Sequence, residues 1–458
     1  MKRIYFAALV GLFGCVSALS AQGRSELLLE KNWKFTREDN NEFIKPAFDD
    51  SKWQSVTVPH DWAIYGPFSS LNDKQEVAIS QDGQKEAMEH AGRTGGLPFV
   101  GVGWYRTEFD VPQFQAGKRA TILFDGAMSH ANVYINGQKV GYWPYGYNSF
   151  HFDITKYLKP GKNTVAIHVL KYSDGYYLEG QDYWRLAGIF DDVWLYATPS
   201  VRLFDWYVVT DLDDTYTDAD LKLQVDIKKY TEEVSIDYRL KVQLWDDRKE
   251  LVTELNSDPF KIESIGKKRL DLSRLIKNPK KWTSETPYLY TLKMSLLTMD
   301  GAEHDAIETR MGFKETEIRG EAFYLNGVLL KVNAQNSHMQ HPEMGHAMTE
   351  DIIRKDFEIL KQFNFNAVRT SHYPPVNKYL ELADEYGLFV IDEAGVEAHA
   401  TEFVSKKPEF TEMYKERVRQ MVLRDRNHPS ILFWSAGNES GEGFNIGEVV
   451  KEGRKYDY

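Results

Sequence analysis

The stretch Ile431-Leu432-Phe433-Trp434-Ser435-Ala436-Gly437-Asn438-Glu439-Ser440 decides how the last third of the sequence folds. It opens with four apolar residues, the pattern of a strand covered on both faces, and it ends in polar residues after a glycine. Strands covered on both faces belong to parallel sheets, so the polar residues beyond this strand are candidates for a functional site. For Glu439, position alone leaves two interpretations open. It is either a proton donor whose pKa burial has raised, or a carboxylate favoured by a helix dipole.

Three further strand-and-helix units precede this strand, and one helical stretch, residues 444–454, follows it. The predicted strands are residues 328–332, 367–369 and 388–391. Apolar residues at helical spacing follow each strand; Thr349 caps the first helix and Gly387 closes the second. This alternation predicts a parallel sheet. Residues 318–458 are therefore expected to form the first half of a (β/α)8 TIM barrel, since a complete barrel needs about 250 residues.

Each predicted strand is followed by polar residues of types that take part in catalysis. They are Asn336 and His338, then Ser371 and His372, then Asp392, Glu393, Glu397 and His399, and finally Asn438 and Glu439. The C-terminal ends of barrel strands meet at one face, so we expect these side chains to converge there. Glu397 and His399 could hold one ion if the backbone is extended, but the pair alone is better explained as solvated surface. His338 is interpreted as a substrate contact, and His341 is given no role.

The earlier part of the sequence is predicted to be β-structure in two regions. From residue 24 to 198, short apolar or alternating runs are separated by turn residues, and Asn136-Gly137 is a strong hairpin signal. This pattern predicts a jelly roll or sandwich. Residues 199–317 alternate more cleanly between apolar and polar and have the length of one immunoglobulin-like β-sandwich.

Composition and charge limit the partners. The 56 basic and 68 acidic residues give a net charge of −12, which argues against nucleic acid and anionic membrane surfaces and favours a neutral ligand. Aromatic residues make up 14% of the chain. Some of them could stack on sugars, but most are better explained as β-sheet core.

The N-terminus is predicted to be a secretory signal peptide, residues 1–21. Lys2 and Arg3 precede an apolar run, and small residues before Gln22 offer a cleavage site. The run is too short to span a bilayer as a helix. We therefore expect a secreted or periplasmic protein, with a lipid anchor on Cys15 as the weaker alternative. Cys15 is the only cysteine, so a mature chain would contain no disulfide.

Several of these stretches resemble glycoside hydrolase family two. Residues 427–440 are similar to its acid/base signature, and the ending Gly437-Asn438-Glu439-Ser440 is similar to that of its β-galactosidases. The other similar stretches are residues 365–374 and 392–399 in the barrel, residues 59–62, 103–106 and 182–190 in a sugar-binding domain, and residues 311–313 at the entry to the barrel. The resemblance covers essentially the whole mature chain.

The resemblance implies a role for each matching residue. Glu439 would be the general acid and then the general base of a retaining double displacement. Asn438 would bind the sugar 2-hydroxyl, while other sugar contacts would come from His372, His338 and Asp182. Glu397, His399 and Glu439 would hold Mg2+. Arg369 would support the nucleophile.

Two departures from the family pattern matter. The family commonly has Asn-Arg-His-Glu after the first strand, whereas this chain reads Asn336-Ser337-His338-Met339, so the hydrogen bonding around His338 must differ. A retaining enzyme also needs a second carboxylate about 5–5.5 Å from the first. The family takes it from a later barrel strand, and residues 1–458 supply none. We therefore expect this chain, as a truncated form, to be inactive or nearly so, and to be poorly soluble because its sheet has an open apolar edge.

The function predicted from these residues is an exo-β-glycosidase that removes terminal β-D-galactosyl residues from glycans. One alternative keeps the family but changes the sugar to a β-glucuronide or β-mannoside. Another is a secreted, non-catalytic carbohydrate-binding protein with a degenerate barrel. Homo-oligomer formation by a longer form is left open.

Overall fold

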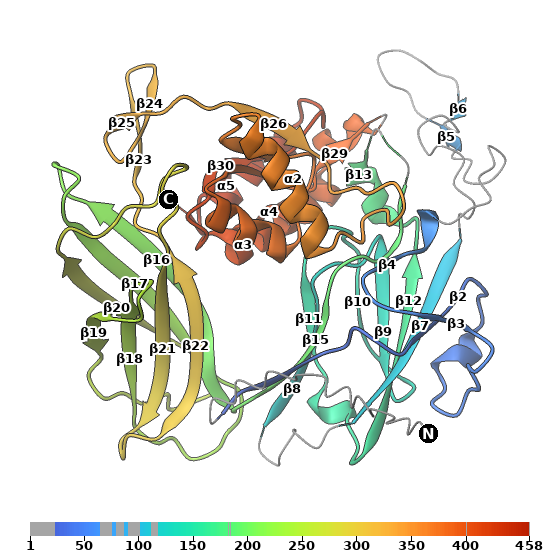
Figure 1. The fold of residues 1–458 in the computed structure, drawn as a ribbon. Coiled ribbons are helices and arrows are strands. Elements are labelled where there is room, and N and C mark those ends of the chain that lie inside the picture. The colour runs from blue at the N-terminus through green and yellow to red at the C-terminus, as the bar shows by residue number, and fades with distance from the viewer. Residues whose placement is uncertain are drawn as a thin grey trace, which may run out of the picture.

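The computed structural model describes residues 23–64, 76–78, 87–89, 101–110, 118–181, 183, 185–399 and 401–457. The predicted signal peptide, residues 1–21, and the predicted sugar contact Asp182 lie outside these residues. Figure 1 shows three regions, with the helices of the C-terminal region lying across the ends of two β-rich regions. Among the described residues, no helix has the length and apolar character needed to cross a membrane.

The first β-rich region is a sandwich of two antiparallel sheets. One sheet has the order β1 (Ser25–Leu28), β15 (Val193–Thr198), β8 (Arg119–Phe124) and β11 (Phe150–Asp153). The other has the order β10 (Gln138–Trp143), β9 (His130–Ile135), β12 (Lys162–Leu170), β7 (Val102–Asp110), β2 (Trp33–Thr36) and β3 (Gln54–Val56). Asn136 and Gly137 join β9 to β10 with positive φ angles of 51° and 81°, which confirms the predicted hairpin. The jelly-roll architecture predicted from short strands and turns is also confirmed.

Three short strand pairs accompany these sheets, and one of them connects this region to the barrel. They are β4 (His60–Asp61) with β14 (Gly188–Ile189), β5 (Glu76–Ala78) with β6 (Ala87–Glu89), and β13 (Glu179–Gly180) with β29 (Glu397–Ala398). The last pair is parallel and joins two regions far apart in sequence. It therefore fixes part of the jelly roll beside one of the predicted site loops.

The second β-rich region is a seven-stranded sandwich, as the alternating pattern predicts. Its sheets are β16 (Val201–Leu212), β17 (Ala219–Lys229) and β20 (Gly266–Ile276), and β19 (Leu251–Asn256), β18 (Tyr238–Trp245), β21 (Tyr290–Thr298) and β22 (Glu303–Met311). In β17 and β18, alternate residues are fully buried between the sheets. Apolar residues alternate with polar ones along most of these strands, so one face of each strand lies in the core.

The C-terminal region contains a four-stranded parallel sheet in the order β26 (Ala334–Ser337), β27 (Ala367–Thr370), β28 (Phe389–Glu393) and β30 (Ile431–Ser435). The helices between and after the strands are α2 (Glu350–Gln362), α3 (Asn377–Tyr386), α4 (Thr411–Asp425) and α5 (Phe444–Gly453). This is the predicted partial barrel. As expected, Thr349 is the N-cap of α2 and Gly387, in the left-handed conformation, ends α3.

The prediction of the first barrel strand was wrong. Val328 and Leu329 form β25, which pairs with β24 (Ala322–Leu325) and β23 (Thr316–Arg319) in a small antiparallel sheet. Asn326 and Gly327, both with positive φ, turn the chain back at this point. The barrel strand is the polar and largely exposed β26, so the search for an apolar run selected the wrong segment.

Candidate active site

Glu439 lies in the loop after β30, between the sheet and α5. Gly437 has a φ of +137°, and a Cβ placed there would stand 2.5 Å from the carbonyl oxygen of Val396. The close approach of the two loops lets the Asn438 N–H donate to that same carbonyl at 2.9 Å. The backbone thus fixes Asn438 and Glu439 against the loop that carries Glu397 and His399.

The Glu439 side chain is not buried, as the sequence had suggested, but is 65% exposed. Its carboxylate contacts His399, with Oε2 3.0 Å from His399 Nε2. The difference has a physical reason: Glu439 follows β30, which among the described residues is an edge strand with a partner on one side only, so the loop after it is open to solvent. The second interpretation of Glu439, a carboxylate at a helix N-terminus, also does not hold, because α5 begins only at Phe444.

Glu397, His399 and Glu439 lie together, as the sequence predicted. His399 Nε2 is 2.8 Å from Glu397 Oε1 and 3.0 Å from Glu439 Oε2. Glu397 is buried, and its second oxygen, Oε2, has no hydrogen-bond partner among the described residues. Among the described residues, no group of three or more His, Cys, Asp or Glu side chains is arranged to hold a metal ion.

Asn438 connects this cluster to the interior of the sheet. Its amide nitrogen donates to Glu397 Oε1 at 3.1 Å, and its carbonyl oxygen accepts from Arg369 Nη2 at 3.0 Å. Both contacts agree on the orientation of the amide, since an arginine can only donate and a carboxylate can only accept. The Asn438 side chain is therefore held in one rotational state.

Glu393, at the end of β28, is the buried acceptor at the centre of the site. Its Oε2 accepts from Arg369 Nε at 2.8 Å and from Ser435 Oγ at 2.6 Å, and its Oε1 is 2.7 Å from His372 Nδ1. Burial favours the protonated carboxyl, but these hydrogen bonds outweigh it and lower the pKa of Glu393. Sequence analysis noted Glu393 only as a polar strand end and missed this role.

His372 and His338 lie side by side near the jelly roll. Their ring centroids are 5.3 Å apart with the planes nearly perpendicular, and the Tyr183 ring is 5.1 Å from His338. Gln181 Nε2 donates to the His372 carbonyl at 3.4 Å. The segment of the jelly roll on either side of Asp182 therefore reaches the two histidines, although Asp182 itself is not described.

Three other strand-end residues do not join the site. Asp392 faces the opposite side of the sheet from Glu393, because neighbouring strand residues alternate in direction. It is buried, and burial followed by the nearby Asp425 raises its pKa well above the ordinary value. Ser371 donates to the Arg369 carbonyl instead of facing the cluster. Asn336 lies within β26 rather than after it.

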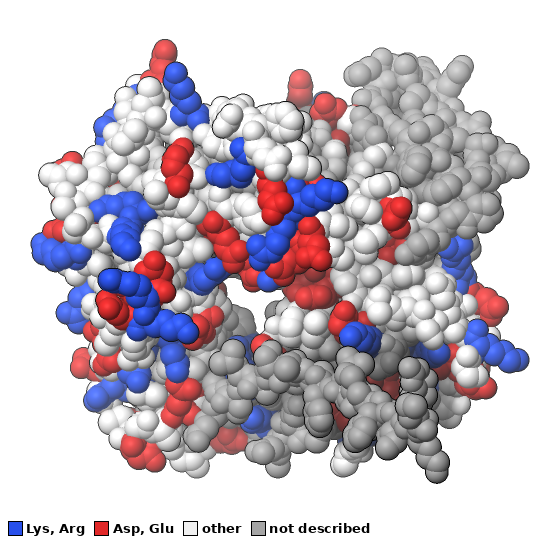
Figure 2. Space-filling model, viewed as in Figure 1, with Lys and Arg blue, Asp and Glu red and all other residues white. Residues whose placement is uncertain are grey.

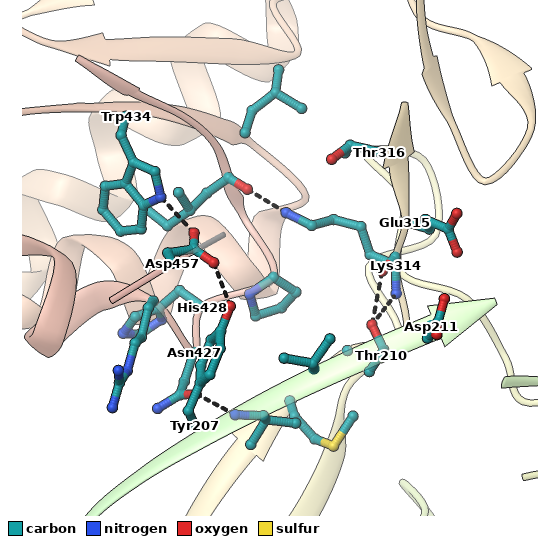
Figure 3. A pocket seen from close by; sticks show the side chains of 18 residues that line it. Tyr207, Thr210, Asp211, Lys314, Glu315, Thr316, Asn427, His428, Trp434 and Asp457 are labelled. Atoms are coloured by element: carbon teal, nitrogen blue, oxygen red, sulfur yellow. Dashed lines mark hydrogen bonds between the residues drawn. The ribbon is translucent and has the colours of Figure 1, made fainter. Parts of the chain in front are cut away.

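A cavity of about 510 Å3 lies elsewhere, at the junction of the second sandwich with the barrel (Figure 3). Lys314 donates to the Ile431 carbonyl, and Asp457 accepts from Tyr207 and, at 2.6 Å, from Trp434 Nε1. Asn427 accepts from the Val208 N–H at 2.9 Å. These bonds connect β30 and the residues just before it to β16 and to the segment after β22. The first residues of the stretch 427–440 therefore join two regions, while its last residues form the site.

The described chain matches three models of one family, in order along the sequence. They are "Glycosyl hydrolases family 2, sugar binding domain" at residues 28–199, "Glycosyl hydrolases family 2" at residues 201–314, and "Glycosyl hydrolases family 2, TIM barrel domain" at residues 316–458. The chain belongs to glycosyl hydrolase family 2, as its motifs predicted.

Relatives and solved structures agree with this assignment. The chain is 35% identical to a β-galactosidase of Vibrio vulnificus over 94% of its own length, and 36% identical to one of Priestia megaterium over 91%. It spans only 41% of the length of each. A family 2 glycosyl hydrolase from Bacteroides cellulosilyticus superposes with a TM-score of 0.80 at 27% identity, covering 94% of this chain and 55% of that one. A Bacteroides uniformis β-glucuronidase gives 0.77 at 24% identity, covering 95% and 48%, which supports the fold alone.

Proposed function

We propose that this chain forms part of a retaining exo-β-glycosidase that removes terminal β-D-galactosyl residues from glycans, with Glu439 as its acid/base. The observation that carries the proposal is one continuous set of contacts from Glu393 through Arg369, Asn438 and Glu397 to His399 and Glu439. A solvated loop would not need a buried carboxylate and an oriented amide leading to its exposed glutamate. A site that holds a sugar hydroxyl beside a proton donor needs both the buried carboxylate and the oriented amide.

In the proposed mechanism, Glu439 gives its proton to the glycosidic oxygen as the bond breaks, and then takes a proton from the attacking water. Asn438 binds the sugar 2-hydroxyl, and His372, His338 and Asp182 bind other hydroxyls. Exposure of Glu439 suits this role, because the departing group and the water both have to reach it. The fixed positions of Asn438 and His372 supply orientation before the substrate arrives.

The second carboxylate of this mechanism is proposed to lie on a later barrel strand, in the length that the relatives have and residues 1–458 do not span. Arg369 would then stand beneath it. Glu393 is not a substitute for that nucleophile. Its two oxygens are already engaged by three side chains, and they are buried below the sugar contacts.

The proposal includes a Mg2+ site at Glu397, His399 and Glu439, which rests on the types of their donor atoms, because the three side chains are not arranged around an ion in the described structure. Two carboxylates supply the oxygen ligands that Mg2+ prefers, and the buried Glu397 Oε2 lacks a partner among the described residues. When bound, the ion would offset the negative charge of the two glutamates. Glu397 and His399 hold the Glu439 carboxylate beside Asn438 in any case.

The choice of galactose rests on the ending Gly437-Asn438-Glu439-Ser440 and on the names of the relatives. The proposal includes export by residues 1–21 and a glycan as the partner. Both acidic and basic side chains occur on the face seen in Figure 2.

Hydrolysis of nitrophenyl β-galactoside, β-glucuronide and β-mannoside tests the sugar. It is measured on residues 1–458 and on the product of any coding sequence that continues past Tyr458. We expect galactoside to be the preferred substrate of the longer product. Preference for another sugar would reject galactose, and the absence of turnover on all three would favour a non-catalytic sugar-binding protein.

The role of Glu439 is tested in the active form with Glu439→Ala. Loss of the acid should slow a substrate with a poor leaving group far more than one with an activated aryl group, which departs without a proton. Added azide should restore turnover and give the β-galactosyl azide, since azide attacks without a general base. Equal loss on both substrates without azide rescue would remove Glu439 from this role.

A further inference from the structure

Glu393 contacts three side chains of the site from beneath, and they come from the two strands that flank β28. Arg369 lies on β27, His372 follows β27, and Ser435 ends β30. The Glu393 carboxylate is fully buried, and its own N–H donates to Thr370 Oγ1 at 3.0 Å. Its position is therefore set by both the backbone and the side chain.

The donors around this carboxylate determine which partner each of its two oxygens accepts from. Arg369 Nε can only donate, and with Ser435 Oγ it occupies Oε2. The positive charge of Arg369 and the hydrogen bonds from Arg369 and Ser435 favour the ionised carboxylate. The other oxygen, Oε1, is thus an acceptor without a proton of its own, and it lies 2.7 Å from His372 Nδ1.

The consequence for His372 is that Nδ1 must carry the proton. In neutral imidazole only one ring nitrogen is protonated, so Nε2 becomes the acceptor that is left for a ligand hydroxyl. The same carboxylate fixes Arg369 through Nε, while Arg369 Nη2 donates to the Asn438 carbonyl oxygen at 3.0 Å. One buried group thus acts on two side chains that face the sugar.

We propose that Glu393 is the positioning residue of this site, which sets the Nδ1–H tautomer of His372 and, through Arg369, the orientation of the Asn438 amide. The importance of these two settings for sugar binding rests on the proposed function. The tautomer of His372 and the orientation of the Asn438 amide are properties of the chain itself, so they can be measured without turnover.

The test is 15N NMR of the histidine side chains in the full chain, on the wild type and Glu393→Gln. In the wild type, at a pH where the His372 ring is neutral, we expect a pyrrole-type shift for His372 Nδ1 and a pyridine-type shift for Nε2. Glutamine has one oxygen and one NH2 group. Its oxygen must serve the two donors Arg369 and Ser435, which turns the NH2 group toward His372. His372 should therefore change to the Nε2–H tautomer.

Two controls separate a specific effect on His372 from a general change in the structure. His428 Nδ1 is paired with Asp384 Oδ2 at 2.6 Å in another part of the barrel, and its shifts should not change. Ser435→Ala removes one bond to Glu393 but leaves the contact with His372, so the His372 tautomer should also stay as in the wild type. An unprotonated Nδ1 in the wild type would overturn the proposal without any variant. So would a folded Glu393→Gln protein, with His428 unchanged, in which His372 keeps Nδ1–H.

Titration of the same samples with isopropyl β-D-thiogalactoside separates this proposal from the proposed function. If the wild type binds this probe, Glu393→Gln should bind it about tenfold more weakly, the loss expected when a hydrogen bond is left unmade. Failure of the wild type to bind it would count against the galactoside assignment. The tautomer result would still decide the role of Glu393.

Discussion

At the scale of single residues, the site depends on a glycine with an unusual backbone conformation. Gly437 has a φ of +137°, and an added Cβ would stand 2.5 Å from the Val396 carbonyl oxygen. We expect Gly437→Ala to lower the free energy of unfolding by about 1–3 kcal/mol. The strain falls directly before Asn438, so weaker sugar binding should accompany it.

Gly447 is the matched control for this change. It lies in the interior of α5, and an added Cβ would meet nothing within 4 Å. Gly447→Ala should raise the free energy of unfolding by about 0.5–1 kcal/mol, because alanine loses less entropy in a helix. Urea unfolding of both variants measures the contrast. Equal effects of the two changes would show that the backbone at Gly437 is not strained against alanine.

The metal proposal can also be tested at single residues. We expect addition of Mg2+ to raise the Tm of the wild-type chain, because an ion bound only by the folded state stabilises it. Glu397→Gln should abolish this rise, since it replaces a buried ligand oxygen that has no partner among the described residues. Glu448→Gln changes a glutamate on the outside of α5 and should leave the rise intact. A rise that survives Glu397→Gln would place the ion elsewhere.

The residues that could be predicted from the sequence were those with recognisable patterns around them. Glu439, Asn438, His372, Glu397 and His399 were found in this way, and they do lie in one connected group. The exposure of Glu439 could not be predicted, because it depends on which elements pack over the loop. The geometry of Glu393 was missed for a related reason, since its three donors come together only when β27 and β30 flank β28.

At the scale of secondary-structure elements, periodicity predicted the helices and the apolar strands and failed for β26. Ala334–Ser337 is short, polar and exposed, and only its pairing with β27 makes it a strand. The apolar Val328 and Leu329 were chosen instead, although the Asn-Gly turn before them is a hairpin signal. An apolar run reports burial and cannot by itself distinguish a barrel strand from a hairpin strand.

The contact between the jelly roll and α3 predicts a pH effect. Burial, partly offset by Arg424, raises the pKa of Asp125 to about 6, and Asn377 donates to its carboxylate at 3.0 Å. A carboxyl whose pKa is raised in the folded state binds protons more tightly there than in the unfolded chain. Its contribution to stability is therefore full below about pH 4 and is lost as the pH rises to about 6.

Asp125→Asn removes this penalty while keeping an oxygen that can accept from Asn377. The variant should gain stability over the wild type as the pH rises from 4 to 7, by on the order of 2 kcal/mol. Thermal melts of both proteins across this range measure the difference. A difference in Tm that does not change with pH would show that Asp125 ionises as it does in water.

At the scale of the whole molecule, a buried ion pair holds the jelly roll against the barrel. Glu179 of β13 accepts from Arg417 of α4 at 2.8 Å and from Arg185 at 3.0 Å, and all three are buried. Arg417→Met should cost on the order of 3 kcal/mol, because the remaining carboxylate loses one of its two cationic partners in a dry interface. Urea unfolding measures the loss. Lys451→Met, which removes an exposed pair with Glu448, should cost less than about 1 kcal/mol, and a similar loss in both would mean that the interface pair is solvated.

The free edge of β30 determines how the molecule behaves with its own copies. Among the described residues, β30 has a partner strand on one side only. Lys314 donates to the Ile431 carbonyl, but Phe433 is 40% exposed, with the Phe323 ring 4.8 Å away. An exposed apolar edge strand is a template for pairing with another chain. We expect sedimentation velocity of the full chain to show association that grows with concentration.

Phe433→Glu should reduce this association, because a charge on the edge strand opposes docking of a second apolar strand. Phe363→Glu is the appropriate control, since Phe363 is 69% exposed at the end of α2 and lies on no strand. If exposed aromatic area alone drove association, the change at Phe363 would be at least as effective. Reduction by Phe433→Glu only would locate the contact at β30, where backbone groups and an apolar side chain are exposed together. Sedimentation of the wild type as a single monomeric species at all concentrations would instead show that Lys314 and the neighbouring hairpin protect the edge.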